Sequence, residues 1–245
     1  MPTAPRPLLI AVLAGIALVA ALAGLLLALT RPDPGAWAPP VDSPPRAAEP
    51  GNGIATLVDD EWVASTAAAT GIPERALAAY AGAAIVKADG MPECGLSWTT
   101  IAGIGATESD HGRHAGSGVG PDGTVTPPIY GIALDGGDTA HIPDSDDGTL
   151  DGDAEFDRAV GPFQLLPQTW RNWHTDGSGD GVEDPQNIDD AAMAAVNYLC
   201  RAVTGEGFDF TTAEGWRIGV AAYNSPDSYL ATVADHANRY AEAVG

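Results

Sequence analysis

The sequence predicts an all-α or mainly α fold. Several segments open with residues that favour helix N-termini, and one of them carries apolar residues at spacings of three and four. No stretch of any length alternates apolar and polar residues as a half-buried strand would. We expect helices at 60–69, 73–88, 97–109, 165–173, 189–203, 212–223 and 226–243.

Helix start signals are clearest in the first half of the chain. Pro73 and the acidic Glu74 suit a first helical turn, where proline loses no hydrogen bond and a carboxylate faces the positive end of the helix dipole. Ser97 is a good N-cap, and Leu96 before it and Ile101 after it predict a hydrophobic staple. These signals predict where the second and third helices begin.

The charge balance is strongly acidic. The 245 residues include 11 Lys and Arg against 33 Asp and Glu, which gives a formal net charge of −22. Because such a field repels phosphate groups, the composition argues against a nucleic acid partner and against peripheral binding to anionic lipid. It is compatible with a neutral or sugar-rich polymer, and equally with a charge that only keeps the protein soluble.

The N-terminus predicts a membrane anchor. Residues 8–29 carry no charged or strongly polar side chain, and a helix of that length spans about 33 Å, enough for a bilayer core. A cleavable signal peptide, the alternative, has an apolar stretch of only about 7–15 residues. We therefore expect a short cytoplasmic segment at 1–7, a single-pass anchor at 8–30, a linker at 31–53 and an extracytoplasmic catalytic domain at 54–245.

Two long segments are predicted to lack regular secondary structure. Residues 31–52 hold seven prolines and predict a stiff, extended tether, which would hold the following domain away from the membrane. The region from Ser109 to Arg158 is rich in Gly, Asp and Pro, and we expect cleft-building loops and short turns there. Its acidic run at 144–157 could bind a cation or form an exposed turn.

The two cysteines predict a disulfide. Cys94 and Cys200 lie in a segment that we expect outside the cytoplasm, where an even number of cysteines favours pairing. The alternative is a pair of buried free thiols.

The strongest candidate for chemistry is Glu108. One stripe of the predicted helix contains Trp98, Ile101, Gly105 and Glu108. The carboxyl group of Glu108 therefore lies on the apolar side of the helix, at its C-terminal end. Burial disfavours the charged form and raises the pKa, as a general acid near neutral pH requires. The alternative is a capping glutamate or one paired with Arg113.

Two further segments carry polar groups suited to binding a sugar. In 158–170, Gly161 and Pro162 allow a close backbone approach, and Gln164 offers both a donor and an acceptor. In 216–226, a predicted helix ends at Tyr223 and Asn224 before Pro226, and a hydroxyl and an amide there are natural partners for a buried acid. Each signal is common by itself.

The order of these features resembles the lytic transglycosylases of the lysozyme superfamily, in particular the branch of membrane-bound lytic transglycosylase B. Glu at a helix end, then G-P-F-Q-x-x-P-x-x-W, then A-Y-N runs over about Cys94 to Asn224. The resemblance implies a lysozyme-like α fold and peptidoglycan glycan strands as substrate. It implies that Glu108 is the single catalytic acid, that Gln164 contacts substrate, that Tyr223 is hydrogen-bonded near the acid, and that Asn224 completes the pair.

A second match concerns residues 176–190. Asp176, Ser178, Asp180 and the Val182 carbonyl follow the spacing of an EF-hand loop, but the twelfth position is Asn187 rather than glutamate. The transglycosylase B branch resembles this loop more closely, because its lengthened loop closes with an aspartate at position fifteen, here Asp190. The resemblance implies a structural Ca²⁺; the alternative is an ion-free loop of Asx-turns. No cofactor is expected for the chemistry.

Three rival functions remain open at this point. A hydrolytic muramidase would need a second carboxylate, for which Asp110, Asp153 and Asp157 are the candidates. A non-catalytic wall-binding domain would bind glycan without turnover. A zinc hydrolase would use Asp110, His111 and His114, although the two histidines lie in a Gly-rich stretch where we expect surface or cleft-lip residues.

Overall fold

The computed structural model of the chain describes residues 37–137 and 139–245. The expected cytoplasmic segment, the membrane anchor and the first part of the linker lie outside these residues. Within them, no helix combines the length and the apolar character needed to cross a bilayer. Residues from Trp37 to Gly245 form one compact unit.

The described chain is mainly helical, as predicted. Seven α-helices follow one another, and each lies where the sequence predicts one: α2 (Asp60–Thr70), α3 (Glu74–Gly90), α4 (Trp98–Ser109), α5 (Pro167–Trp173), α6 (Ile188–Thr204), α7 (Ala213–Tyr223) and α8 (Asp227–Val244). Three short 3₁₀ turns join them: η1 (Ile54–Leu57), η2 (Pro92–Cys94) and η3 (His114–Gly116). Ser97 caps α4 by accepting a hydrogen bond from the Thr99 backbone N–H, which confirms the predicted helix start.

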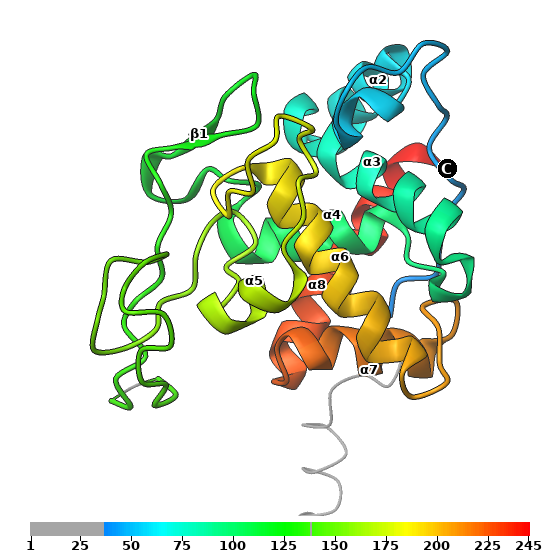
Figure 1. Cartoon of the computed structure of the whole chain (residues 1–245). Coiled ribbons are helices and arrows are strands. Elements are labelled where there is room, and N and C mark those ends of the chain that lie inside the picture. The colour runs from blue at the N-terminus through cyan, green and yellow to red at the C-terminus, as the bar shows by residue number, and fades with distance from the viewer. Residues whose placement is uncertain (1–36, 138) are drawn as a thin grey trace, which may run out of the picture. The chain divides into compact units, whose positions relative to one another are not determined.

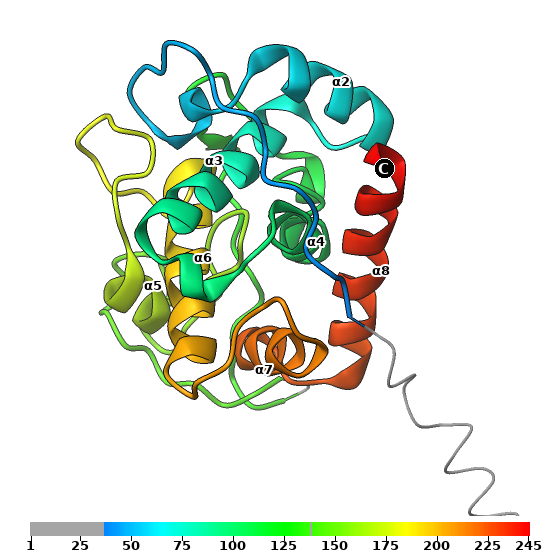
Figure 2. The same cartoon turned by 90° about the vertical axis from the view of Figure 1, so that its right-hand side faces the viewer.

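Helix α4 is the centre of the core. Figure 2 shows it end-on, with α3, α6, α7 and α8 around it. Its side chains are buried over nearly its whole length, and Ile101 and Ile104 have no exposed surface. A Cβ added at Gly103 would lie 2.8 Å from the Val233 carbonyl oxygen, so glycine is what lets α8 approach the α4 backbone. A residue at the end of α4 is therefore held by the best-packed part of the protein.

Part of the predicted linker packs on the helices. Ala38 is buried, the Trp37 carbonyl accepts a hydrogen bond of 3.0 Å from the Asn238 side chain, and the Ala47 N–H donates to the Leu57 carbonyl. The compact unit thus starts at Trp37 rather than near Ile54, because these backbone groups find partners on the folded domain. The rest of the predicted linker lies outside the described residues.

The region between α4 and α5 consists of loops and short pairings, as predicted. Strands β1 (Gly118–Val119) and β2 (Val125–Thr126) pair antiparallel, with Gly118 opposite Thr126. Isolated bridges join Tyr130 with Val160 and Pro143 with Phe156. In Figure 1 these segments form the green loops on one side of the helices. They place one wall of loops beside the helical core.

A disulfide closes the helical part. The Cα atoms of Cys94 and Cys200 lie 5.3 Å apart and their sulfur atoms are bonded, which confirms the predicted pair. The bond ties the turn η2 to α6 across 106 residues of sequence. In the chain-entropy model a loop of this length is worth about 4.7 kcal/mol, because it restricts the unfolded chain.

Candidate active site

Glu108 lies in the last turn of α4 and is partly exposed. The Tyr229 hydroxyl donates a hydrogen bond to Glu108 Oε1 at 2.5 Å. Burial raises the pKa of Glu108 to about 7, while the bond from Tyr229 works in the opposite direction by favouring the carboxylate. The C-terminal end of a helix also disfavours a negative charge. The group can therefore donate a proton near neutral pH and then carry the charge.

The backbone just after Glu108 is held in an uncommon conformation. Asp110 and His111 both have left-handed backbone angles, with φ of 51° and 60°, which costs energy for residues other than glycine. The His111 ring supplies the compensation, since it is 2% exposed and makes hydrogen bonds of 3.2 Å to the Tyr80 hydroxyl and 3.0 Å to the Tyr240 hydroxyl. It thereby joins the end of α4 to α3 and α8.

The segment that contains Gln164 is a tight turn. Val160 and Leu165 exchange two backbone hydrogen bonds, and the turn between them brings Gly161 to φ 74°. A Cβ at Gly161 would lie 1.8 Å from the Pro185 carbonyl oxygen, so no other residue fits there. Gln164 is half-buried with φ 46°, and its amide nitrogen donates to the Gly161 carbonyl at 3.0 Å. A Cβ added at Gly131 would lie 3.1 Å from the side-chain oxygen of Gln164, so that oxygen lies close to the Gly131 backbone.

Two hydrogen bonds fasten this turn to the helices beside Glu108. The buried Ser109 hydroxyl donates to the Pro162 carbonyl at 2.6 Å, and the Tyr223 hydroxyl donates to the Phe163 carbonyl at 2.5 Å. The negative charge of Glu108 is one cause, after burial, of the raised pKa of Tyr223, so the two side chains lie within electrostatic reach. The structure thus brings Glu108, Tyr223 and the turn that contains Gln164 together.

The other residues of the predicted set lie around this centre. Asn224 follows Tyr223 as the C-cap of α7, and it is exposed. Tyr229, which the sequence analysis did not single out, stands in the first turn of α8. The short connection between α7 and α8 could have indicated Tyr229. Pro226 starts α8 directly after Asn224, so the first turn of α8 lies near the end of α7.

The three candidate second carboxylates are engaged elsewhere. Asp110 is exposed and pairs with Arg113, Asp153 pairs with Arg158, and the buried Asp157 accepts bonds from the Ser145 N–H and hydroxyl. A like charge close to Glu108 would raise its pKa further. Within the described chain, the causes of that pKa are burial and the Tyr229 bond, and no carboxylate is among them.

The zinc hypothesis is not supported by the positions of its residues. His111 is buried between two tyrosines, and burial lowers its pKa to about 4, whereas His114 is exposed. The prediction that His111 is a surface residue is wrong, because its ring is a hydrogen-bonded part of the core. In the part of the chain that the structure describes, a single group of three metal-type side chains gathers its ligand atoms within 4.8 Å: Asp144, Asp146 and Asp157.

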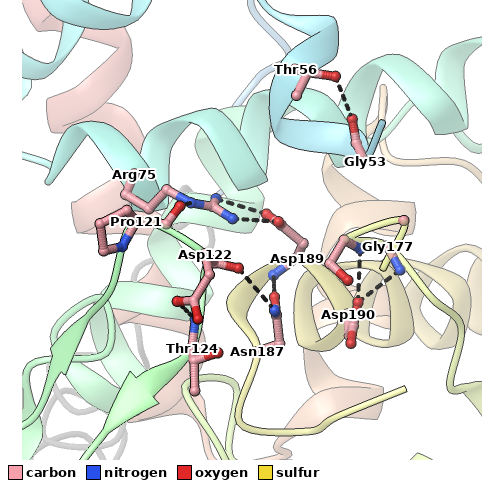
Figure 3. A network of polar contacts seen from close by, with 12 residues as sticks. Gly53, Thr56, Arg75, Pro121, Asp122, Thr124, Gly177, Asn187, Asp189 and Asp190 are labelled. Atoms are coloured by element: carbon pink, nitrogen blue, oxygen red, sulfur yellow. Dashed lines mark hydrogen bonds and ion pairs between the residues drawn. The ribbon is translucent and has the colours of Figure 1, made fainter. Parts of the chain in front are cut away.

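The loop at 176–190 is held together by its own backbone. Asp190 is fully buried in the first turn of α6, and its carboxyl oxygens accept hydrogen bonds of 2.8 to 2.9 Å from the N–H groups of Gly177, Ser178 and Asp184. Figure 3 shows the bond from Gly177. Asp176 and Asp180 likewise accept from N–H groups of the loop, and Val182 is exposed. N–H groups of the loop therefore bond all three carboxylates of the predicted ligand set, and the structural Ca²⁺ stays a prediction.

A partly buried ion pair fixes the neighbouring loop. Figure 3 shows the Arg75 guanidinium on the Asp189 carboxylate, next to the loop of Asp190. Arg75 also donates to the Pro121 carbonyl at 3.1 Å, and the Asn187 side chain donates to the Asp122 carbonyl at 3.1 Å. These bonds hold the β1–β2 hairpin on α3 and α6. Comparison of the chain with protein-family models, curated proteins and solved structures finds no match in any of the three.

Proposed function

We propose that this chain is a peptidoglycan lytic transglycosylase with a lysozyme-like fold. It cleaves the β-1,4 bond between N-acetylmuramic acid and N-acetylglucosamine, and Glu108 is its single general acid and base. The observation that carries the proposal is the state of Glu108, whose pKa is raised to about 7 at a partly exposed helix end. A carboxyl group with that pKa is protonated in a large fraction of molecules at neutral pH.

The proposed reaction has two proton transfers. Glu108 first gives its proton to the glycosidic oxygen, and the acetamido group of the substrate stabilises the positive charge that develops on the sugar. The Glu108 carboxylate then takes the proton of the muramoyl 6-hydroxyl, whose oxygen attacks the anomeric carbon and closes a 1,6-anhydro ring. Because the nucleophile is already tethered to the sugar, no water is consumed and proximity supplies much of the rate.

Tyr229 serves both steps in this scheme. Its hydrogen bond of 2.5 Å stabilises the carboxylate that remains after the first transfer and aims the free oxygen of Glu108. Tyr223 and the Val160–Leu165 turn form the adjoining wall, where Gln164 and Asn224 would contact the glycan. Ser109 fixes the distance between this wall and the acid, since it bonds the Pro162 carbonyl from the residue next to Glu108.

The setting that we propose is the outer face of a membrane, with the domain directed at the cell wall. The disulfide between Cys94 and Cys200 supports an oxidising compartment. The apolar stretch at 8–29 supports a single-pass anchor. In that setting the substrate is the glycan strand of peptidoglycan, which the domain faces from the membrane.

The test is digestion of purified peptidoglycan by the full chain in detergent, with mass analysis of the products. We expect 1,6-anhydromuropeptides from the wild type and none from Glu108→Gln, which keeps the shape of the side chain but not its proton. Asp110→Asn is the matched control, because it changes an exposed acid two residues away. Products one water heavier would replace the lyase with a hydrolase, and binding without turnover would leave a wall-binding domain.

A further inference from the structure

The ends of three helices enclose a surface pocket of about 500 Å³ that the proposed reaction does not use. Its walls are the last turn of α2, the end of α4 and the C-terminal half of α8, and Figure 2 shows α2 beside the C-terminal end of α8. Ala106 of α4 lines the pocket. Glu108, two residues further along the helix, is turned about 200° away from Ala106 and so faces away from the pocket. The pocket is therefore separate from the site of the acid.

Two arginines supply the positive charge of this pocket. Arg113 and Arg239 line it, in a chain that has 11 basic against 33 acidic residues. Each has an aspartate partner at the surface: Arg113 lies 2.7 Å from Asp110, and Arg239 lies 3.9 Å from Asp235. The four side chains are 43% to 75% exposed. Because exposed ion pairs contribute little free energy, an anionic ligand can compete for either guanidinium.

His236 adds a third donor to the pocket. The Arg239 guanidinium contacts His236 Nδ1, and because a guanidinium can only donate, Nδ1 must accept. Burial and the charge of Arg239 lower the pKa of His236, which favours the neutral ring. A neutral imidazole with Nδ1 as acceptor carries its proton on Nε2. The ring, which lines the pocket, is therefore a donor through Nε2 alone.

The hydroxyl of Tyr240 is a fourth donor. In the core, the Tyr80 hydroxyl has one hydrogen-bond partner among the described residues, His111 Nδ1, so the Tyr80 proton lies in that bond. Burial keeps His111 neutral by lowering its pKa to about 4. With Nδ1 as acceptor, the His111 ring donates through Nε2 to the Tyr240 oxygen at 3.0 Å. The proton of Tyr240, which lines the pocket, is therefore left for a partner outside this chain of bonds.

We propose that this pocket binds a carboxylate with a small apolar substituent. Two guanidinium groups, one imidazole and one hydroxyl offer donors, and an ionised carboxyl group accepts from several donors at once. Ala69, Ala106 and Ala243 also line the pocket, and their methyl side chains suit a small apolar substituent. A singly charged carboxylate is favoured over a phosphate group, because Asp110 and the C-terminal ends of α2 and α4 oppose negative charge. The proposal does not depend on the reaction at Glu108.

Titration calorimetry of the full chain in detergent with N-acetylalanine tests the site. We expect wild type to bind N-acetylalanine and not N-acetylalanine amide, which has a similar shape without the charge. Arg239→Gln should weaken the binding about tenfold or more, because a charge-assisted hydrogen bond is lost. Asp110→Asn should strengthen it, because the acid that competes for Arg113 loses its charge, and asparagine tolerates the left-handed backbone at this position.

The matched control is Arg46→Gln, which breaks an exposed pair with Asp89 away from the pocket and should leave the affinity unchanged. The proposal is overturned if wild type binds the acid no better than the amide, or if Arg46→Gln weakens binding as much as Arg239→Gln. Tighter binding of inorganic phosphate than of N-acetylalanine would also contradict it. Should Arg239→Gln fail to fold, the contrast between acid and amide on wild type decides.

The same measurement with acetyl-trialanine separates two sources of the carboxylate. Tighter binding than that of N-acetylalanine supports the C-terminus of a peptide as the ligand, and equal binding supports a small free acid. Both results require the carboxylate to occupy the pocket, so Arg239→Gln should weaken the binding of either compound.

Discussion

Two carboxyl groups of this protein, Glu108 and Asp190, lie at helix ends and differ in what surrounds them. Glu108 stands in the last turn of α4, where one hydroxyl, that of Tyr229, reaches it. Asp190 stands in the first turn of α6, where it accepts three backbone N–H bonds. Burial raises the pKa of both, to about 7 for Glu108 and about 6 for Asp190.

The comparison shows that a raised pKa does not by itself distinguish a catalytic acid. At the C-terminal end of α4 the helix dipole opposes a negative charge, and a single donor leaves the second oxygen of Glu108 free to exchange a proton. At the N-terminal end of α6 the dipole favours the charge, and the N–H groups hold Asp190 in place. If Glu108 acts as proposed, the number and kind of hydrogen-bond donors separates a group that reacts from one that organises a loop.

The largest expected effect is a contrast between two variants: Asp190→Asn should lose stability, and Glu108→Gln should lose activity. Asp190→Asn should lower the free energy of unfolding by about 2–4 kcal/mol, because an amide cannot accept all three N–H bonds. Glu108→Gln should instead reduce turnover by about 10²–10⁴-fold, the usual contribution of a general acid. Urea unfolding and product release measured on both variants check this. Equal losses of stability in the two variants would remove the distinction.

The pH dependence of stability gives a second test of the difference between Glu108 and an ordinary carboxyl group. The pKa of Glu108 is higher in the folded state, at about 7, than its ordinary 4.5, so wild type loses stability as pH rises between these values. Glu108→Gln cannot ionise and should be more stable than wild type at pH 8, with a much smaller difference at pH 4. Urea midpoints at both pH values test it. A difference independent of pH would mean that Glu108 has an ordinary pKa.

His111 extends the comparison to a basic side chain, because its imidazole ring is also buried. Burial lowers its pKa from 6.5 to about 4, so its contribution to stability is present above pH 6.5 and is lost as pH falls toward 4. His111→Asn should lower the free energy of unfolding at pH 7.5 by about 1–3 kcal/mol and flatten its fall below pH 6.5. The exposed His114→Asn is the control and should change neither quantity. An unchanged acid limb in His111→Asn would contradict the assignment.

The smallest effect concerns the donor on Glu108. Tyr229→Phe removes the hydrogen bond that favours the carboxylate, so the pKa of Glu108 should rise by about one unit. The basic limb of the kcat/KM profile should move to higher pH by the same amount, while kcat falls. Tyr198→Phe, whose hydroxyl bonds the Ala222 carbonyl instead of the acid, is the control. Equal pH profiles for wild type and Tyr229→Phe would show that Tyr229 does not act on Glu108.

Local signals in the sequence predicted the helices well. Ser97 before α4 acts within one turn of the chain, so its effect does not depend on distant residues. The stripe that contains Glu108 is likewise a property of one helix. The proline-rich segment was harder, because whether Ala38 packs on the domain depends on a surface formed by residues far along the chain.

Contacts between distant elements could not be predicted in the same way. Tyr229 meets Glu108 across 121 residues, and His111 meets Tyr240 across 129, and no spacing within one segment signals either bond. His111 was expected at the surface because a Gly-rich stretch shows no periodicity. The buried side-chain oxygen of Asp146 that has no hydrogen-bond partner among the described residues is also invisible in the sequence, where 144–157 and 176–190 look equally acidic.

The sequence by itself predicted the helical class, the helix bounds to within about two residues, a cysteine pair and the placing of one glutamate at the end of an apolar helix. These follow from interactions within a few residues and from composition. The tertiary structure alone decided which groups surround that glutamate, which acidic loop satisfies its own carboxylates and which histidine is buried. Desolvation and hydrogen bonding depend on neighbours that only folding brings together.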